Sequence, residues 1–457
     1  MLKKRWSKKL QTTLAAGIIA TSITPVLAQA AETSEFQEIN IQKIMDDIAL
    51  LAVNDNARVT GFEGEHDAAN YLVDEFQNLG IKTRKQMVTD IVGYIAETPE
   101  VYINGEAINA KPLTYSNKAN ALEGELVYCG LGKPDSFNNI DVKGKIALIK
   151  RGEISFADKV NNATANGAKG VIIYNNVDGA LNGTLGNYDS DRAPSVSIDK
   201  ATGDALTARI NQGEKINASI TLDTQIEENS YSYNVVANIP AANSPRTKQT
   251  IVLGAHFDSV QCPGANDNAS GTAAILEIAK ILSQPEYKEK LNYNIEIVAF
   301  GAEEIGLIGS QEYVKSLQDS GKIDKVKGMI NLDMIGLGDA IQTYNIDPNA
   351  SHDLTNIAEK HVQNLGYDYG GHYNSSSSDH APFEAVGVPS VFLNYSPDPN
   401  YHTDKDITEA IDPQNVENMI NVVLNIILDM QDDDPRVPVK TSKYSTIQFE
   451  NEEIPSK

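Results

Sequence analysis

The stretch from residue 250 to residue 282 reads TIVLGAHFDSVQCPGANDNASGTAAILEIAKIL, and it decides the fold. It opens on a largely apolar strand at 250–255, as expected for a sheet that is buried on both faces. It closes on a helix at 269–282. Ligands of such sheets bind beyond the carboxyl ends of the strands, so the polar residues between this strand and this helix are placed to form a site.

Strands and helices alternate along the chain to about residue 430. Further strands are expected at 295–301, 326–335 and 390–393, and further helices at 35–53, 64–79, 307–318, 351–365 and 413–430. This alternation is typical of a doubly wound α/β fold. We therefore predict an α/β domain with a mostly parallel, mixed sheet.

Five potential metal ligands fall at or just past the ends of the expected strands. They are His256, Asp267, Glu304, Asp333 and His402. Two histidines and three carboxylates can hold two zinc ions if one carboxylate is shared. Asp267 opens the helix that follows and is placed to bridge two cations. Asp333 lies in a mostly apolar run, where an unpaired carboxylate is costly to bury, so a cation is expected beside it.

Three further side chains are candidates for catalysis. Glu303 adjoins Glu304, so one glutamate can ligate a metal while the other acts as a general base. Asp258 can accept the second ring N–H of His256 and fix its tautomer. Tyr401 offers a phenol that can hydrogen-bond the oxyanion of a tetrahedral intermediate.

Each motif taken alone also has a structural explanation. Asp267 suits the N-cap of the following helix, and adjacent glutamates at a helix start are favoured by the helix dipole. Asp379 and His380 either line the same site or form a structural turn. The order and spacing of the five segments favour the metal site over these separate explanations.

Taken in order, the five segments resemble the co-catalytic di-zinc aminopeptidases, the family of secreted bacterial leucyl aminopeptidases. The resemblance covers about 230–430 and implies a zinc-exopeptidase fold with two Zn²⁺ per chain. It implies that His256 and Asp333 hold one zinc. It implies that Glu304 and His402 hold the other, with Asp267 as the bridging ligand.

The same resemblance assigns the remaining roles. It makes Glu303 the general base and Tyr401 the tyrosine that stabilises the oxyanion. In that family a cis peptide follows the bridging aspartate, so the bond between Asp267 and Asn268 is expected to be cis. The implied substrates are peptides with a free N-terminus, with leucine, arginine or lysine in first position. Glu303, Asp333 and one zinc are candidates for orienting the substrate amine.

A segment of different character precedes the catalytic motifs. Short apolar strands are expected at 126–128, 146–149 and 171–174, with a helix at 155–167. The runs 144–152, 155–159 and 165–175 resemble a protease-associated domain, a small β-rich insert without catalytic residues of its own. The predicted divisions are a signal peptide at 1–30, peptidase parts at 31–117 and 229–431, the insert at 118–228 and a mobile tail at 432–457.

The first 30 residues are typical of a signal peptide. Five basic residues come first, namely Lys3, Lys4, Arg5, Lys8 and Lys9. A mostly apolar stretch at 14–27 follows, and Ala28-Gln29-Ala30 is an A-x-A cleavage site. Thr21, Ser22, Thr24 and Pro25 interrupt the apolar stretch, which disfavours a transmembrane helix. We therefore expect a secreted protein with no membrane association after signal removal.

Composition narrows the choice of partners. The chain has 457 residues, of which 41% are hydrophobic and 22% charged, as in a folded soluble protein. Its formal net charge of −24 makes nucleic acid and anionic membranes poor partners. An acidic surface also permits substrates that begin with lysine or arginine. The sequence indicates neither the oligomeric state nor the side-chain preference.

Other functions remain open from the residues alone. A carboxypeptidase or dipeptidase on the same scaffold usually needs a cation for the substrate carboxylate, and Arg436 is the only arginine after Arg246. A non-catalytic binding relative would be expected to lack a ligand or Glu303. A thiol peptidase centred on Cys262 has no identifiable histidine partner. Cys129 and Cys262 form either one bridge or two free thiols, and no EF-hand-like loop supports a calcium site.

Overall fold

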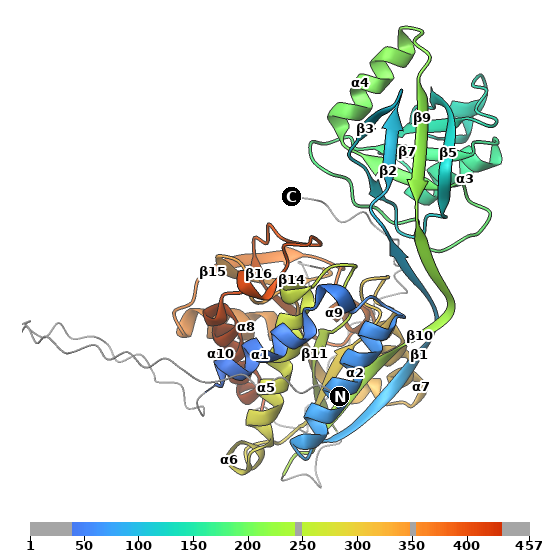
Figure 1. Ribbon diagram of the computed structural model, residues 1–457. Helices are drawn as coiled ribbons and strands as arrows, with labels where there is room; N and C mark the ends of the chain where they lie inside the picture. The colour runs from blue at the N-terminus through green and yellow to red at the C-terminus, as the bar shows by residue number, and fades with distance from the viewer. Residues whose placement is uncertain (1–38, 243–248, 348–352, 432–457) are drawn as a thin grey trace, which may run out of the picture. The chain divides into compact units, whose positions relative to one another are not determined.

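The computed structural model describes residues 39–242, 249–347 and 353–431 (Figure 1). The predicted signal peptide at 1–30 and the predicted tail at 432–457 lie outside the described residues. Among the residues that are described, none of the helices has both the length and the apolar character needed to cross a membrane. Cys129 and Cys262 are both buried free thiols.

The larger sheet has eight strands in the order β1-β10-β12-β11-β13-β16-β14-β15. Its four central strands are parallel, namely β12 (Asn294–Phe300), β11 (Thr250–His256), β13 (Val326–Leu332) and β16 (Ser390–Ser396). The outer strands are β1 (Lys82–Ala96), β10 (Thr224–Ile239), β14 (Ala340–Asn345) and β15 (Tyr369–Asn374). β10 and β14 pair antiparallel with the central block. The sheet is therefore mixed and mostly parallel, which confirms the predicted fold class.

Helices cover both faces of this sheet (Figure 1). One face packs against α1 (Ile41–Leu51), α2 (Glu63–Asn78), α5 (Gly271–Ser283), α8 (Asp353–Asn364) and α10 (Pro413–Asp429). The other face packs against α7 (Ile308–Asp319) and α9 (His380–Ala385). Alternate residues of β11 explain this layering, because Ile251 and Leu253 join the first core whereas Val252 joins the second.

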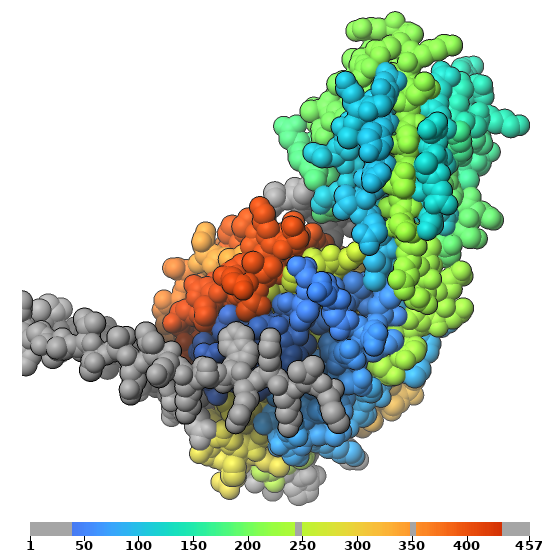
Figure 2. All heavy atoms as spheres, in the orientation of Figure 1, coloured from blue at the N-terminus to red at the C-terminus, as the bar shows by residue number. Residues whose placement is uncertain are grey.

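The two ends of the described chain meet in the first core. Buried residues of α1, such as Ile44 and Ile48, belong to the same cluster as Met419 and Ile420 of α10. Figure 2 shows the N-terminal helices beside residues from the C-terminal part of the chain on one face of the molecule. Residues before the insert therefore complete the core of the domain that follows it.

The second sheet also has eight strands, in the order β3-β2-β9-β5-β6-β7-β8-β4. Its strands are β2 (Glu100–Ile103), β3 (Glu106–Ile108), β4 (Lys111–Pro112), β5 (Ala119–Tyr128), β6 (Ile146–Lys150), β7 (Gly170–Tyr174), β8 (Ser195–Ile198) and β9 (Asn217–Leu222). Its helices are α3 (Phe156–Ala165) and α4 (Lys200–Asn211). Strands β2 to β4 pair into this sheet although the sequence assigns their residues to the peptidase part. The exact domain boundaries stay a prediction.

Short helical segments complete the chain. They are η1 (Asn54–Asn56), η2 (Pro134–Phe137), η3 (Ala265–Ser270), α6 (Pro285–Lys288), η4 (Ile323–Lys325) and η5 (Thr408–Ala410). The segment η3 is an irregular turn in which the backbone angles of Asp267 and Asn268 are not helical, and the regular helix α5 begins only at Gly271. The predicted helix at 269–282 therefore starts two residues later than expected.

Arg58 ties the N-terminal segment to the loop that follows β11. Its side chain is fully buried and donates hydrogen bonds to four backbone carbonyls. The acceptors are Leu51 at 2.5 Å, Phe257 at 2.6 Å, Gly264 at 2.8 Å and Pro263 at 2.9 Å. Because three of these carbonyls lie between His256 and Asp267, the guanidinium fixes the path of the backbone between two of the predicted ligands.

Arg58→Met is expected to lower the free energy of unfolding by at least about 3 kcal/mol, since an unsatisfied buried acceptor costs roughly 1–3 kcal/mol. Equilibrium unfolding in urea measures this change. Arg84→Met is the matched control, because the Arg84 side chain is 54% exposed and pairs with Glu296 at 3.4 Å. That control is expected to cost less than about 1 kcal/mol. Equal losses in the two variants would contradict a clamping role for Arg58.

Candidate metal centre

Eight polar side chains gather beyond the carboxyl ends of the central strands. They are His256, Asp258, Asp267, Glu303, Glu304, Asp333, Tyr401 and His402. His256 ends β11, the two glutamates follow β12, and Asp333 follows β13. Neighbouring parallel strands end at the same edge of a sheet, which is why residues far apart in the sequence meet here. These eight are the five metal ligands and the three catalytic residues that the sequence predicts.

The bridging position expected for Asp267 has a clear geometric counterpart. Its Oδ1 lies 3.1 Å from Nε2 of His256, and its Oδ2 lies 3.0 Å from Nε2 of His402. Asp333 Oδ1 lies 3.2 Å from the first histidine, and Glu304 Oε2 lies 3.1 Å from the second. Asp267 therefore turns one oxygen to each of two histidine–carboxylate pairs.

These separations fit shared cations. Zinc binds nitrogen and oxygen at about 2.0–2.2 Å, so two tetrahedral ligand atoms are about 3.3 Å apart. The four nitrogen–oxygen separations around Asp267 are 3.0–3.2 Å. Four carboxylates crowd around only two imidazoles, and that excess of negative charge favours a bound cation over ion pairs within the chain. The side chains present here fit two metal ions.

The turn η3 presents Asp267 through a tightly constrained backbone. Gly264, just before the turn, has φ of +64°, and a Cβ there would lie 2.4 Å from the Asp267 carbonyl oxygen. The peptide bond between Asp267 and Asn268 is cis, which confirms the expectation from the resemblance. The Asn268 side chain donates to Leu332 O at 2.8 Å and accepts from Gly271 N at 2.9 Å. These contacts join the turn to the end of β13 and to the start of α5.

Asp258 supports the pair of glutamates. Its carboxylate accepts hydrogen bonds from Glu303 N at 3.1 Å, Glu304 N at 3.2 Å and Thr60 Oγ1 at 2.7 Å. The ring Nδ1 of His256 lies 3.2 Å from the Asp258 carbonyl oxygen but 3.6 Å from its carboxylate. The ring N–H therefore donates to the carbonyl rather than to the carboxylate that the sequence suggested. The ring orientation is still the expected one, because Nε2 faces the carboxylates of Asp267 and Asp333.

Asp333 is oriented by a hydroxyl that sequence reasoning missed. Ser378 Oγ donates to Asp333 Oδ2 at 2.7 Å and accepts from Asn331 Nδ2 at 2.7 Å. This leaves Oδ1 to face His256. Thr60 supports Asp258 in the same way, from a segment some 200 residues earlier. Neither hydroxyl has a local sequence signal, because both contacts depend on long-range folding.

The carboxylates of the site raise the pKa values of both histidines. Burial lowers the pKa of His402, but the charges of Glu304 and Asp267 outweigh it and raise the pKa to about 10. Burial also opposes the protonation of His256, yet Glu303 and Asp333 raise its pKa well above the usual value. Burial raises the pKa of Glu303 and of Glu304. A metal must therefore displace protons when it binds.

The metal-free protein is expected to lose stability as the pH rises from 6.5 to about 10. His402 has a pKa of about 10 when folded and about 6.5 when unfolded. Its contribution is fully present below pH 6.5 and is lost as the pH rises through 10. The raised pKa values of Glu303 and Glu304 act in the same direction. Urea midpoints measured in chelator at stepped pH test this, and His402→Asn should flatten the slope. A level midpoint in the metal-free wild type would contradict it.

Three further residues were singled out near the candidate metal centre, namely Tyr401, Asp379 and His380. The Tyr401 ring stacks on His402 with centroids 3.8 Å apart, and burial raises its phenol pKa well above the usual value. The phenol therefore stays protonated and able to donate. His380 Nε2 lies 3.0 Å from Ser375 O, and burial lowers its pKa to about 4, which favours the structural turn for this residue. Asp379 is buried, and burial raises its pKa to about 7.

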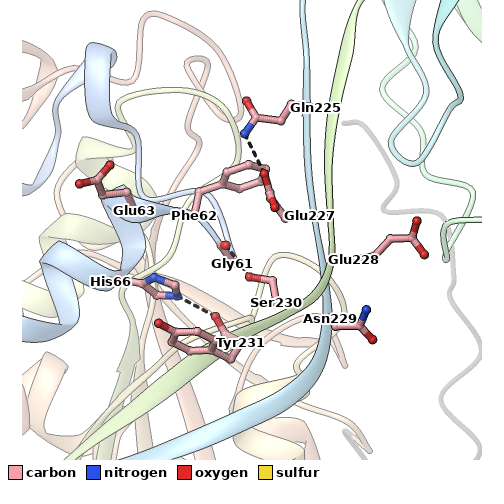
Figure 3. Close-up of a pocket in the computed structure, with 10 residues that line it drawn as sticks. All are labelled: Gly61, Phe62, Glu63, His66, Gln225, Glu227, Glu228, Asn229, Ser230 and Tyr231. Atoms are coloured by element: carbon pink, nitrogen blue, oxygen red, sulfur yellow. Dashed lines mark hydrogen bonds between the residues drawn. The ribbon is translucent and has the colours of Figure 1, made fainter.

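A separate cavity of about 450 Å³ lies between the start of α2 and strand β10 (Figure 3). Its lining comes from 61–66 and 225–231 and includes none of the eight residues above. His66 stacks on Tyr231 at 4.4 Å and hydrogen-bonds the Tyr231 carbonyl at 2.8 Å. The Gln225 side chain donates to Glu227 at 3.1 Å. These contacts occupy His66 and Gln225 within the pocket itself.

Comparisons with known proteins agree with this geometry. The model of peptidase family M28 matches residues 234–427, and the PA domain model matches 122–206. Leucine aminopeptidase 2 of Arthroderma otae is 34% identical over 77% of this chain and 70% of that protein. Aminopeptidase YwaD of Bacillus subtilis is 30% identical over 91% of each chain.

Solved structures give the same result. The aminopeptidase from Aneurinibacillus sp. strain AM-1 has a TM-score of 0.74 and 35% identity, covering 90% of this chain and 97% of that one. BSAP, a zinc aminopeptidase from Bacillus subtilis, has a TM-score of 0.72 and 27% identity, covering 89% and 99%. The chain therefore belongs to peptidase family M28: it is an aminopeptidase of that family with an inserted PA domain.

Proposed function

We propose that this chain is a secreted metalloaminopeptidase that removes N-terminal residues from peptides at a centre of two zinc ions. The observation that carries the proposal is Asp267, whose two oxygens lie 3.1 Å and 3.0 Å from two different histidines. A carboxylate in that position can bridge two cations. The similar protein BSAP is named a zinc aminopeptidase, which supports zinc as the metal.

The five ligands divide into two sets. His256 and Asp333 hold one zinc, Glu304 and His402 hold the other, and Asp267 is shared. Nitrogen and oxygen ligands suit Zn²⁺, and cobalt or manganese can substitute. A bound zinc pair lowers the pKa of water and polarises the scissile carbonyl of the peptide.

Glu303 is the general base in this proposal. A carboxylate oxygen of Glu303 lies within 4.8 Å of ligand atoms of His256 and Asp333, yet Glu303 belongs to neither histidine–carboxylate pair. It takes a proton from the attacking water and delivers it to the leaving amine. Burial and the charges of neighbouring carboxylates raise its pKa in the metal-free chain.

The remaining residues bind and orient. Tyr401 donates its phenol hydrogen to the oxyanion of the tetrahedral intermediate. Asp258 holds the backbone of Glu303 and Glu304 in place through its carboxylate. Glu303 and Asp333 are placed to pair with the free α-ammonium of the substrate, so a substrate with a blocked amine binds poorly. Leucine, arginine and lysine are the proposed first residues of the substrate.

Metal analysis of the purified full chain tests the zinc part of the proposal. Two zinc ions per chain are expected, and prolonged dialysis against a strong chelator should remove both. A chain that keeps full activity with less than one metal ion would contradict a two-metal centre. Export is tested separately by N-terminal sequencing of protein from the culture medium. Cleavage after Ala30 predicts a mature chain that begins at Ala31.

A further inference from the structure

Asp406 is a buried carboxylate next to the metal centre that no role above uses. It lies four residues after His402 and is 1% exposed, whereas its neighbours Asp404 and Lys405 are exposed. Burying a carboxylate is costly unless it accepts strong hydrogen bonds. The contacts of Asp406 therefore indicate what this burial achieves.

Asp406 binds three consecutive backbone N–H groups of η3. Its Oδ1 accepts from Asn266 N at 2.6 Å, and its Oδ2 accepts from Asp267 N at 3.1 Å. Its own backbone carbonyl accepts from Ala265 N at 3.1 Å. One of these three N–H groups belongs to the bridging residue itself. Hydrogen bonds to an ionised acceptor are about twice as strong as neutral ones.

Asp406 also belongs to the turn that contains His402. Thr403 N donates to Asn400 O at 3.1 Å, and Asp406 N donates to Thr403 O at 3.1 Å. The Thr403 hydroxyl also donates to Asn400 O at 2.6 Å. His402 therefore lies inside a compact turn at 400–406. The last residue of this turn, Asp406, accepts hydrogen bonds from the backbone of η3.

A second contact runs parallel to the first. The Asn266 side chain donates to Asp398 Oδ2 at 2.8 Å, and Asp398 Oδ1 accepts from Asn400 N at 2.7 Å. Both contacts join η3 to the segment 398–406. They lie on the side of the centre where Asp267 Oδ2 and His402 Nε2 are 3.0 Å apart.

We propose that Asp406 is a positioning residue that holds Asp267 and His402 in register and so sets the affinity for the zinc that these two residues share. This role rests on the proposed two-zinc centre. Groups that orient metal ligands typically contribute about 10- to 100-fold in metal affinity. An asparagine at 406 would turn an N–H group toward a backbone donor and lose one of the two carboxylate contacts.

Zinc titration of the metal-free full chain against a chromophoric chelator tests this role. The wild type is expected to bind two zinc ions. Asp406→Asn should bind the zinc of Glu304 and His402 at least about tenfold more weakly, and the other zinc more weakly by a smaller factor, because Asp267 is shared by both. Asp404→Asn, in the same turn but exposed, is the matched control and should titrate like the wild type. Co²⁺ serves as a second probe. The visible absorption spectrum of one of the two bound Co²⁺ ions should differ from that of the wild type in Asp406→Asn but not in Asp404→Asn.

A general loss of stability would not produce this pattern, because it would leave both zinc affinities and the cobalt spectrum unchanged in the folded fraction. Asp406→Glu is the second variant, since it keeps both acceptor oxygens but moves them by one methylene. It should also lower the affinity of the chain for the zinc of Glu304 and His402. Wild-type affinity for both ions in Asp406→Asn would overturn the role. So would failure of both variants to fold, which would assign Asp406 to fold stability instead. A wild type that binds no zinc would overturn the metal centre itself.

Discussion

Glu303→Gln is expected to lower kcat/KM by roughly two to four orders of magnitude while leaving the zinc content of the chain unchanged. Glutamine has the same size and keeps an oxygen at the same place, but it cannot accept a proton from water. Glu303 lies outside the two histidine–carboxylate pairs, and in the proposed function it is the base rather than a ligand, so zinc content is expected to survive the loss of its charge. Steady-state kinetics together with metal analysis of the same sample measure both effects.

Glu312→Gln is the control for this substitution. Glu312 lies on α7, its side chain is 45% exposed, and it pairs only loosely with Lys315 at 3.6 Å. That variant should match the wild type in rate and zinc content. A rate near the wild-type value in Glu303→Gln would show that another group moves the proton. A parallel loss of zinc would show that Glu303 is a ligand rather than a base.

Asp267→Asn is expected to weaken the binding of both zinc ions and to abolish most activity. An amide is neutral and offers only one oxygen, so it cannot face His256 and His402 at once as the carboxylate does. The loss for each ion should exceed the roughly 10- to 100-fold effect typical of groups that merely orient ligands. Zinc titration and activity at saturating zinc measure the two consequences separately.

Asp339→Asn is the matched control for the bridging residue. It removes the same charge at an exposed position, where the backbone N–H of Asp339 donates a hydrogen bond to Ser396 O at 3.0 Å. It should bind two zinc ions like the wild type. Retention of both ions at wild-type affinity in Asp267→Asn would mean that the two metal sites do not share this residue.

The sequence predicted the catalytic half of the fold closely because its central strands are buried on both faces. Such strands appear as short apolar runs, and β11, β12, β13 and β16 all lie where those runs occur. The helix expected at 64–79 is observed as Glu63–Asn78. Since ligands of parallel sheets lie at strand ends, locating the strands was enough to indicate which polar residues meet.

Other elements escaped prediction for physical reasons. The strand β15 (Tyr369–Asn374) is half-exposed, and contains Gly370 and Gly371, so it lacks an apolar or alternating pattern. Strands β2 and β4 join the second sheet by pairing with the distant strands β9 and β8, and β3 follows through its hairpin with β2, so no local pattern indicates which sheet these strands join. The start of α5 was placed too early because η3 has the composition of a helix start, whereas the backbone angles of Asp267 and Asn268 are not helical.

The candidate site likewise contains residues that the sequence predicted and residues that it did not. Its eight polar residues could be named from motifs, because each motif follows an expected strand or opens an expected helix. The residues that orient these eight side chains could not be named from motifs. Arg58, Thr60, Ser378 and Asp406 act through contacts with segments far away in the sequence, or through backbone groups that have no sequence identity. The orientation of His256 toward the Asp258 carbonyl likewise depends on the folded geometry.

Hydrolysis of a panel of aminoacyl p-nitroanilides, with leucine and arginine first, tests the central claim most directly. Each substrate is offered with a free and with an N-acetylated amine, before and after chelation, and again with zinc restored. We predict activity only on the free amines, lost with chelator and recovered with zinc. Equal activity on blocked amines would contradict an aminopeptidase, and so would activity that survives complete removal of the metal.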